Sequence, residues 1–305
     1  MTLDRREFML TTGAGALVGC SSGGEAPAPE QAAAPAPTFS KPLGAQLYTL
    51  RFILPDNTEK ILKDLAAIGY TEVEVLQNDY PGQAELIRQA GLKAVSMHLF
   101  AGLVTGMMGD ADPPQKTVEE AAQFAKSEGL SYLVMPYLPQ DQRGSNLDHY
   151  KAFAAKLNQA GEVAKAAGLG FAYHNHAFEF EPMEGSTPFA TLLAETDPGL
   201  VQLELDVFWV SVTGNDPVSI LGQQSGRVPL VHLKDKAPET PQQYKEGVDK
   251  TAFREVGNGS LDFAAILKAC EQAGVQHYFV EQDQTSGDPL ASLRQSYEHI
   301  RGLEV

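Results

Sequence analysis

The sequence predicts an α/β protein folded as a single (β/α)8 barrel, or TIM barrel, over residues 41–305. Three observations support this prediction. Short apolar segments alternate with amphipathic helical segments, which indicates parallel strands joined by helical crossovers. Helical segments often end in small residues and a Gly, as at Gly69, Gly168 and Gly274, because Gly accepts the left-handed conformation that closes a helix. Eight apolar segments fit into roughly the 250 residues that one barrel takes.

The predicted strands are short and apolar, as expected of strands covered by helices. They span residues 44–50, 72–76, 94–99, 132–137, 170–176, 201–207, 229–233 and 276–281. Apolar residues recur at helical spacing in the helices predicted at residues 57–68, 117–127, 148–167 and 260–273. An open, doubly wound sheet is the alternative. However, the Gly257-Asn-Gly259 pattern follows no strand, so it does not indicate a dinucleotide site.

The composition argues against several classes of protein. The chain has 305 residues, with 39 acidic and 23 basic side chains and a net charge of −16, which argues against a nucleic-acid binder. Its two cysteines, Cys20 and Cys270, cannot form a disulfide framework or a cysteine zinc site. The sequence also lacks the run of about 18 apolar residues that a membrane span needs.

The first forty residues predict export and a membrane tether. Arg5-Arg6 resembles the core of a twin-arginine export signal, and Leu-Val-Gly-Cys, ending at Cys20, resembles a bacterial lipobox. We therefore predict a signal over residues 1–20, a lipid on Cys20, and a disordered Ala/Pro-rich linker over residues 21–40. Together they would tether the barrel to a membrane on its periplasmic side. A chance Arg pair in a poorly ordered terminus is the alternative.

Polar side chains collect where predicted strands end, and this end of a barrel is where chemistry takes place. Five strands deliver them: His98, His174, His176, Glu204, Asp206, His232, Lys234, Asp235, Glu281 and Asp283. Asp206, His232 and Glu281, joined by one more Glu, would favour Mn²⁺ or Mg²⁺, with Co²⁺, Fe²⁺ and Zn²⁺ as alternatives. A single strand-end His is more often structural, so the prediction depends on the convergence of five strands.

Seven sequence elements carry a resemblance to a known family. They are Gly-Tyr-Thr-Glu-Val-Glu at 69–74, Ser-Met-His at 96–98, Tyr-His-Asn-His-Ala-Phe-Glu-Phe at 173–180, Leu-Asp-Val-Phe-Trp at 205–209, Gly-Arg-Val-Pro-Leu-Val-His-Leu-Lys-Asp at 226–235, Gly-Asn-Gly-Ser-Leu-Asp-Phe at 257–263 and Val-Glu at 280–281. In this order and spacing, they resemble the sugar phosphate isomerase/epimerase family of xylose-isomerase-like barrels. The resemblance covers about residues 41–305.

The resemblance implies one divalent metal ion held by residues on strands 5 to 8. It implies three of the ligands, Asp206, His232 and Glu281. Strand 5 departs from the commonest pattern of the family, because Ala172 stands where many members have a Glu. The Tyr-His-Asn-His-x-x-Glu-Phe element resembles that of a subgroup. We therefore expect Glu179 as the fourth ligand, with His176 as the alternative.

The same resemblance implies proton transfer beside a sugar carbonyl. The ion would stabilise an enediolate, and Glu281 and Glu179 are the candidates that move the proton. Lys234 and His98 complete the predicted catalytic set. A plain ion pair is the alternative for Lys234, and a strand-end His bonded to backbone is the alternative for His98.

Four further residues are expected to bind the substrate: His174, His176, Trp209 and Glu74. For Trp209 the alternative is core packing, and for Glu74 it is a buried hydrogen bond. Residues 100–114 and 236–258 are expected to be long loops that set specificity, with disordered decoration as the alternative.

The leading prediction is a metal-dependent isomerase or epimerase of a keto sugar or sugar derivative. The same enediolate permits elimination, so a lyase or hydrolase of 3-keto-glycosides is one alternative, and a non-catalytic sugar-binding lipoprotein is another. An exported enzyme rarely meets sugar phosphates, and the sequence has no evident phosphate-binding Gly/Lys cluster, which favours a neutral sugar. The expected partners are a small-molecule sugar and, by family analogy, a second copy of the chain in a homodimer.

Overall fold

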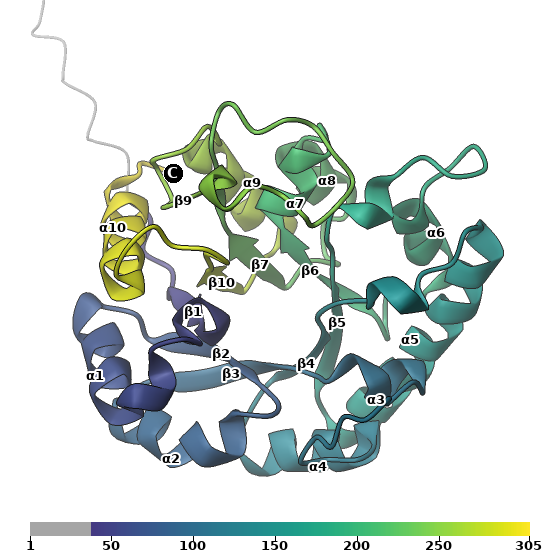
Figure 1. The fold of residues 1–305 in the computed structure, drawn as a ribbon, viewed down its shortest axis with the longest axis horizontal. Helices are drawn as coiled ribbons and strands as arrows, with labels where there is room; N and C mark the ends of the chain where they lie inside the picture. The colour runs from purple at the N-terminus through teal and green to yellow at the C-terminus, as the bar shows by residue number, and fades with distance from the viewer. Residues whose placement is uncertain (1–37) are drawn as a thin grey trace, which may run out of the picture. The chain divides into compact units, whose positions relative to one another are not determined.

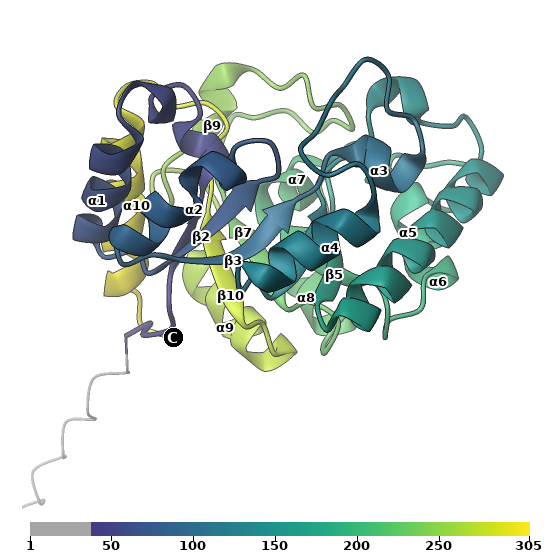
Figure 2. The same cartoon turned by 90° about the horizontal axis from the view of Figure 1, so that it is seen from below.

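The computed structural model describes residues 38–305. The predicted signal, the lipid on Cys20 and most of the predicted linker therefore lie outside the described residues. Eight parallel strands close into one barrel in the order β1-β10-β7-β6-β5-β4-β3-β2, and helices surround it (Figure 1, Figure 2). The prediction of a (β/α)8 barrel is confirmed, and the alternative of an open sheet is wrong.

The barrel strands follow the predicted segments closely. They are β1 (Gly44–Gln46), β2 (Glu72–Leu76), β3 (Lys93–His98), β4 (Tyr132–Met135), β5 (Gly170–His174), β6 (Gln202–Asp206), β7 (Leu230–Leu233) and β10 (His277–Val280). A short antiparallel pair, β8 (Asp235–Lys236) and β9 (Phe253–Arg254), forms a separate small sheet. The helices are α1 (Thr58–Ile68), α2 (Tyr80–Gln89), α3 (Ala101–Thr105), α4 (Val118–Ser127), α5 (Leu147–Ala167), α6 (Pro188–Glu195), α7 (Val207–Val212), α8 (Pro217–Gln223), α9 (Phe263–Ala273) and α10 (Pro289–Gly302).

Local sequence explains where the longest helix begins and ends. At the start of α5, the Asn146 side chain accepts a hydrogen bond from the backbone N–H of His149, which satisfies a donor that the first turn leaves free. Buried residues such as Phe153 and Leu157 face the barrel. The helix ends at Gly168, whose φ of 82° lies in the left-handed region that Gly tolerates best.

Side chains that alternate inward along the strands fill the barrel in layers. Nearer the amino ends, a buried apolar cluster consists of Val95, Tyr132, Val134, Ala172, Leu230 and Phe279. Gly44 packs against this cluster, and a Cβ at that position would overlap the ring of Phe279. Nearer the carboxyl ends the inward-facing residues are polar, so the apolar cluster forms the base on which the polar residues rest.

The end of the predicted linker belongs to the folded domain. Thr38 forms a bridge with Glu304, and Phe39 is buried. The rings of Phe39 and Tyr278 pack edge to face with their centroids 5.1 Å apart. Thr38 and Phe39 therefore pack with the folded domain. The composition of the linker did not indicate that Phe39 would be buried.

One predicted strand is shorter than expected, and two predicted loops contain secondary structure. The first strand ends at Gln46, because its side chain accepts a hydrogen bond from the N–H of Tyr48 and the chain turns into a 3-10 helix over Leu47–Leu50. Residues 100–114 include α3, and residues 236–258 include the pair β8–β9. Within residues 38–305, none of the helices combines the length and the apolar character that crossing a membrane requires.

Two of the sequence elements fold onto each other after β7. Asp235 Oδ2 accepts hydrogen bonds from the backbone N–H groups of Gly257 and Gly259, both at 2.9 Å, and Oδ1 accepts one from Leu261 N–H at 3.2 Å. A Cβ on Gly259 would overlap the Asp235 carboxylate. The Asp of the His-Leu-Lys-Asp element thus has a structural role, holding the Gly-x-Gly turn in place.

Candidate active site

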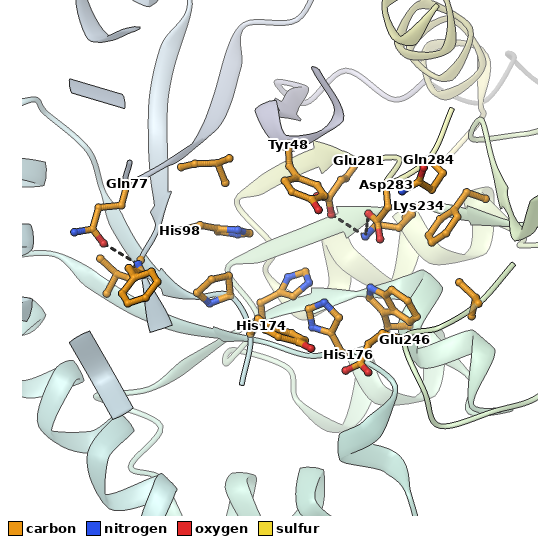
Figure 3. Close-up of a pocket in the computed structure, with 18 of the residues that line it drawn as sticks. Tyr48, Gln77, His98, His174, His176, Lys234, Glu246, Glu281, Asp283 and Gln284 are labelled. Carbon is orange, nitrogen blue, oxygen red and sulfur yellow. Dashed lines mark hydrogen bonds and ion pairs between the residues drawn. The ribbon is translucent and has the colours of Figure 1, made fainter. Parts of the chain in front are cut away.

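A cavity of about 620 Å³ opens at the carboxyl ends of the barrel strands (Figure 3). Its volume is typical of small-molecule sites. Its polar wall includes His98, His174, His176, Lys234, Glu281 and Asp283. Its aromatic and apolar wall includes Tyr48, Leu76, Phe100, Tyr137, Trp209, Val248 and Phe253. The structure therefore brings six of the predicted catalytic and substrate-binding residues to one cavity.

One group of charged side chains surrounds Lys234. Its Nζ lies 2.9 Å from Asp206 Oδ2, 2.8 Å from Glu281 Oε2 and 2.8 Å from Asp283 Oδ1. We call these four residues the lysine group. His232 Nδ1 lies 2.8 Å from Glu281 Oε2. Donor atoms of Asp206, His232 and Glu281 all lie within 4.8 Å of one another, so these three side chains could hold a metal ion.

The electrostatics of the lysine group keep Lys234 and Glu281 charged. Burial opposes the ammonium ion, but the carboxylates of Asp206, Asp283 and Glu281 hold the pKa of Lys234 well above its ordinary value. Burial likewise opposes the Glu281 carboxylate, but Lys234 and His232 hold its pKa well below the usual range. Burial raises the pKa of Asp283 to about 6 even though Lys234 opposes the shift.

A second group lies beside the first and consists of His98, His174, His232 and Glu204. We call it the histidine group. Glu204 Oε2 lies 3.0 Å from His98 Nε2, 3.0 Å from His174 Nδ1 and 3.4 Å from His232 Nε2. One ligand atom from each of the four residues lies within 4.8 Å of the others. His232 joins the two groups, because its Nδ1 faces Glu281 and its Nε2 faces Glu204.

The imidazoles of the histidine group differ in charge. Burial opposes protonation of His98, but Glu74 and Glu204 raise its pKa to about 9. Burial also opposes protonation of His232, and nearby carboxylates, Glu204 first, hold its pKa well above the ordinary value. Burial, reinforced by His232, lowers the pKa of His174 well below the ordinary value. At neutral pH these directions give two protonated imidazoles and one neutral imidazole.

Glu74 lies beneath the cavity and is fully buried. Its Oε1 accepts a hydrogen bond from Gln46 Nε2 at 2.7 Å and lies 2.7 Å from both His98 Nε2 and His232 Nε2. Its Oε2 accepts a hydrogen bond from Ser96 Oγ at 2.5 Å. The sequence prediction expected Glu74 to bind the substrate, but Glu74 does not line the cavity. Its contacts match the alternative of a buried hydrogen-bonded residue that orients two imidazoles.

Glu179 is not brought together with Asp206, His232 and Glu281. Its carboxylate accepts hydrogen bonds from the Tyr173 hydroxyl at 2.7 Å and from the His176 backbone N–H at 2.9 Å. Tyr173 packs on α5 outside the barrel, since side chains of β5 alternate and His174 points inward. Burial raises the pKa of Glu179 to about 8. Strand 5 thus contributes His174, and not Glu179, to the clustered donors.

Two ring nitrogens in the cavity wall have no hydrogen-bond partner within the described part of the chain: His176 Nδ1 and Trp209 Nε1. Both atoms are buried, and the two ring centroids lie 5.2 Å apart. Burial lowers the pKa of His176 well below its ordinary value, so the ring is neutral. Trp209 also packs against Phe208 and Phe253, which means that it both contributes to the core and lines the cavity.

The loop over residues 236–258 covers part of the cavity and is tied to the opposite wall. Glu246, in this loop, forms an ion pair with Arg143, with Oε1 and Nη2 2.6 Å apart and Oε2 and Nη1 3.0 Å apart. The Arg143 guanidinium stacks on the ring of Phe178, with its carbon 3.6 Å from the centroid. We call the Arg143–Glu246 pair the latch.

Three residues of the site had no role predicted from the sequence, although Glu204 and Asp283 were counted among the strand-end polar side chains. Glu204 precedes Asp206 by two positions in β6, and Asp283 follows Glu281 by two, so the alternation of a strand would place each beside its predicted neighbour. Tyr48 comes from a loop whose conformation the sequence does not determine.

Comparison with known proteins identifies the family. The model of the family described as "Xylose isomerase-like TIM barrel" matches residues 62–303, which is most of the chain. The chain belongs to this family.

Named relatives narrow the class of enzyme. Inosose dehydratase from Clostridium perfringens is 25% identical over 271 residues, covering 81% of this chain and 90% of that protein. A solved sugar phosphate isomerase/epimerase from Parabacteroides distasonis has a TM-score of 0.70 and 25% identity, covering 86% of this chain and 94% of that one. The 3-keto-D-glucoside 4-epimerase from E. coli has a TM-score of 0.62 and 17% identity, covering 86% and 99%, and indicates the fold alone. The chain is an enzyme of the sugar-modifying class that includes such dehydratases, isomerases and epimerases.

Proposed function

We propose that the chain is a divalent-metal-dependent isomerase or epimerase that acts on a neutral keto sugar or sugar derivative through an enediolate. One observation carries the proposal: donor atoms of Asp206, His232 and Glu281 converge within 4.8 Å of one another beside Lys234. Two carboxylates and one imidazole fit Mn²⁺ or Mg²⁺ best, while Co²⁺, Fe²⁺ and Zn²⁺ are alternatives.

A bound dication supplies the positive charge that stabilises an oxyanion beside the carbon that loses its proton. We assign Glu281 as the base, because it lines the cavity and is held ionised, whereas hydrogen bonds tie Glu179 to Tyr173 and His176. Lys234 also lines the cavity, and its ammonium donates a hydrogen bond to a sugar oxygen by giving up one of its three carboxylate contacts.

The remaining polar residues of the cavity orient the sugar. His98 is protonated near neutral pH and donates a hydrogen bond or a proton to a sugar hydroxyl. The free nitrogens of His176 and Trp209 hydrogen-bond to further hydroxyls. His174 completes this wall. The aromatic rings opposite stack on the apolar face of the sugar and exclude water from the reacting carbon.

The charge of the cavity supports a neutral substrate. The lysines that line it are Lys234 and Lys250, and Lys234 already contacts three carboxylates. Arg, which binds phosphate through paired N–H groups, is absent from the lining of this cavity in the described residues. The lining therefore offers a sugar phosphate no guanidinium to bind it.

The alternative is a lyase or hydrolase of 3-keto-glycosides, which would use the same proton abstraction and then expel a substituent. Two facts favour this alternative: the cavity is lined by several aromatic rings, and the relatives include a dehydratase. A sugar-binding lipoprotein without activity is the third candidate.

We also propose that the chain is exported and tethered through a lipid on Cys20. The Cys20→Ser substitution should move the protein from the membrane fraction to the soluble periplasmic fraction. A homodimer, proposed by family analogy, predicts twice the mass of one chain in sedimentation equilibrium.

Proton NMR in D2O tests the reaction. The metal-loaded protein is incubated with neutral ketoses and 3-keto-glycosides, and the carbon beside the carbonyl is monitored. Deuterium entering this position with inversion or carbonyl migration supports the proposal, and deuterium entry with release of an aglycone supports the lyase. Binding of sugar without any exchange in every compound would favour the non-catalytic alternative and contradict the proposal.

A further inference from the structure

The histidine group contains donors that the proposed mechanism does not use as ligands. Glu204 Oε2 lies 3.0–3.4 Å from one nitrogen of each of the three imidazoles. Donor atoms bonded to one ion at about 2.0–2.2 Å lie roughly 2.9–3.5 Å from one another. The distances from Glu204 Oε2 to the three imidazoles therefore match those between ligands of one ion, and one ligand atom from each of the four residues lies within 4.8 Å of the others.

A second observation points to a ligand at the same place. Glu204 is fully buried, yet its other oxygen, Oε1, has no hydrogen-bond partner within residues 38–305. A buried carboxylate oxygen without a partner is costly, and a cation bound by both oxygens of Glu204 would satisfy it.

The lysine group and the histidine group differ in what balances the negative charge of their carboxylates. In the lysine group, the ammonium of Lys234 already lies between Asp206 and Glu281. In the described residues, no Lys or Arg forms an ion pair with Glu74 or Glu204. The balancing charge at the histidine group must come from imidazolium protons or from a metal ion.

We propose that His98, His174, His232 and Glu204 form a second metal position, deeper in the barrel than the position proposed at Asp206, His232 and Glu281. Three imidazoles and one carboxylate favour a transition-metal dication such as Zn²⁺ or Co²⁺ over Mg²⁺. Glu74 Oε1 lies 2.7 Å from the same Nε2 atoms of His98 and His232, and Gln46 and Ser96 hold its carboxylate, so Glu74 places a further negative charge beside this position. His232 Nδ1 faces the first position and Nε2 faces the second; binding of ions at both positions at once would require the ring to lose both N–H protons and become an imidazolate.

Metal binding tests this position without measuring turnover, so its failure is distinct from failure of the proposed reaction. The full chain is stripped with a chelator and titrated with Co²⁺, while visible absorption and bound metal are measured. Glu204→Gln and His174→Asn should each remove one equivalent of tightly bound ion and the absorption typical of nitrogen-rich coordination. Glu74→Gln should weaken binding of the ion without removing it, because it takes away a negative charge next to the ion.

Glu72→Gln is the matched control, because Glu72 is also an inward-facing Glu on β2, paired with His277 away from the cavity. It should bind as much Co²⁺ as the wild type. Circular dichroism confirms that each variant is folded. Loss of one equivalent in either Glu204→Gln or His174→Asn, with the fold intact, supports the position. Full retention of ion and spectrum in both folded variants overturns it.

Discussion

The two ends of the barrel interior have the same alternating geometry but differ in how their charges are arranged. Near the amino ends, Glu72 and His277 form one polar contact, with 2.8 Å between Oε2 and Nδ1, beside the ring of Phe279. Two residues further along β2, Glu74 contacts two imidazoles, and these lead to the carboxylates around Lys234. One acid–base pair next to an apolar layer is a structural contact. Many such groups around a cavity shift one another's pKa values, which is typical of catalytic sites.

The largest expected effect is on turnover at the carboxyl end. Glu281→Gln should lower kcat by about 10²–10⁴-fold, because an amide cannot accept the proton that the reaction removes. Glu72→Gln should leave kcat within twofold of the wild type. Steady-state assays on the substrate found by NMR measure both. Near-normal turnover of a folded Glu281→Gln variant would rule out this residue as the base.

The amino end should respond in stability. Phe279→Ala should lower the free energy of unfolding by about 3–5 kcal/mol, because it empties the centre of the apolar cluster. Urea unfolding followed by tryptophan fluorescence measures the loss. A change below about 1 kcal/mol would mean that this cluster does not support the barrel.

The sequence predicted the fold better than the site, for physical reasons. Apolar strands and helix-ending glycines such as Gly168 are local signals, so the barrel was predicted and is confirmed. The inward direction of His232 and Lys234 follows from strand alternation. Glu179 lies beyond the end of β5 in a 3-10 turn, where alternation no longer applies, and its hydrogen bonds to Tyr173 could not be foreseen. The assignment of metal ligands remains a prediction.

Glu179 provides a test through the pH dependence of stability. Its pKa is about 8 in the folded protein against a usual 4.5, so the folded state keeps a proton that the unfolded state has released between these values. The free energy of unfolding of the wild type should therefore fall, relative to Glu179→Gln, by up to about 1.4 kcal/mol per pH unit between pH 5 and 8. The difference should level off above pH 8.

Urea unfolding of both proteins across this range measures the difference. Gln resembles the protonated acid in shape and cannot titrate, so the comparison isolates this one group. Parallel stability curves would contradict a buried, protonated Glu179.

The smallest expected effect concerns the latch over the cavity. Arg143→Met should raise KM several-fold while kcat changes little, because the loop over residues 236–258 would lose its tie to the opposite wall. Arg254→Met is the control, since its pair with Glu239 is more exposed and 3.5 Å long, and such pairs contribute about 0–1 kcal/mol. Equal effects of the two substitutions on KM would show that the latch has no special role.

The most direct test of the central claim is the location of the bound metal. Crystals of the chain equilibrated with Mn²⁺ are measured for anomalous scattering. The account predicts a peak bounded by Asp206, His232 and Glu281, with Lys234 displaced toward Asp283 or solvent. A cavity without a peak at these three residues would contradict the proposed metal-dependent reaction.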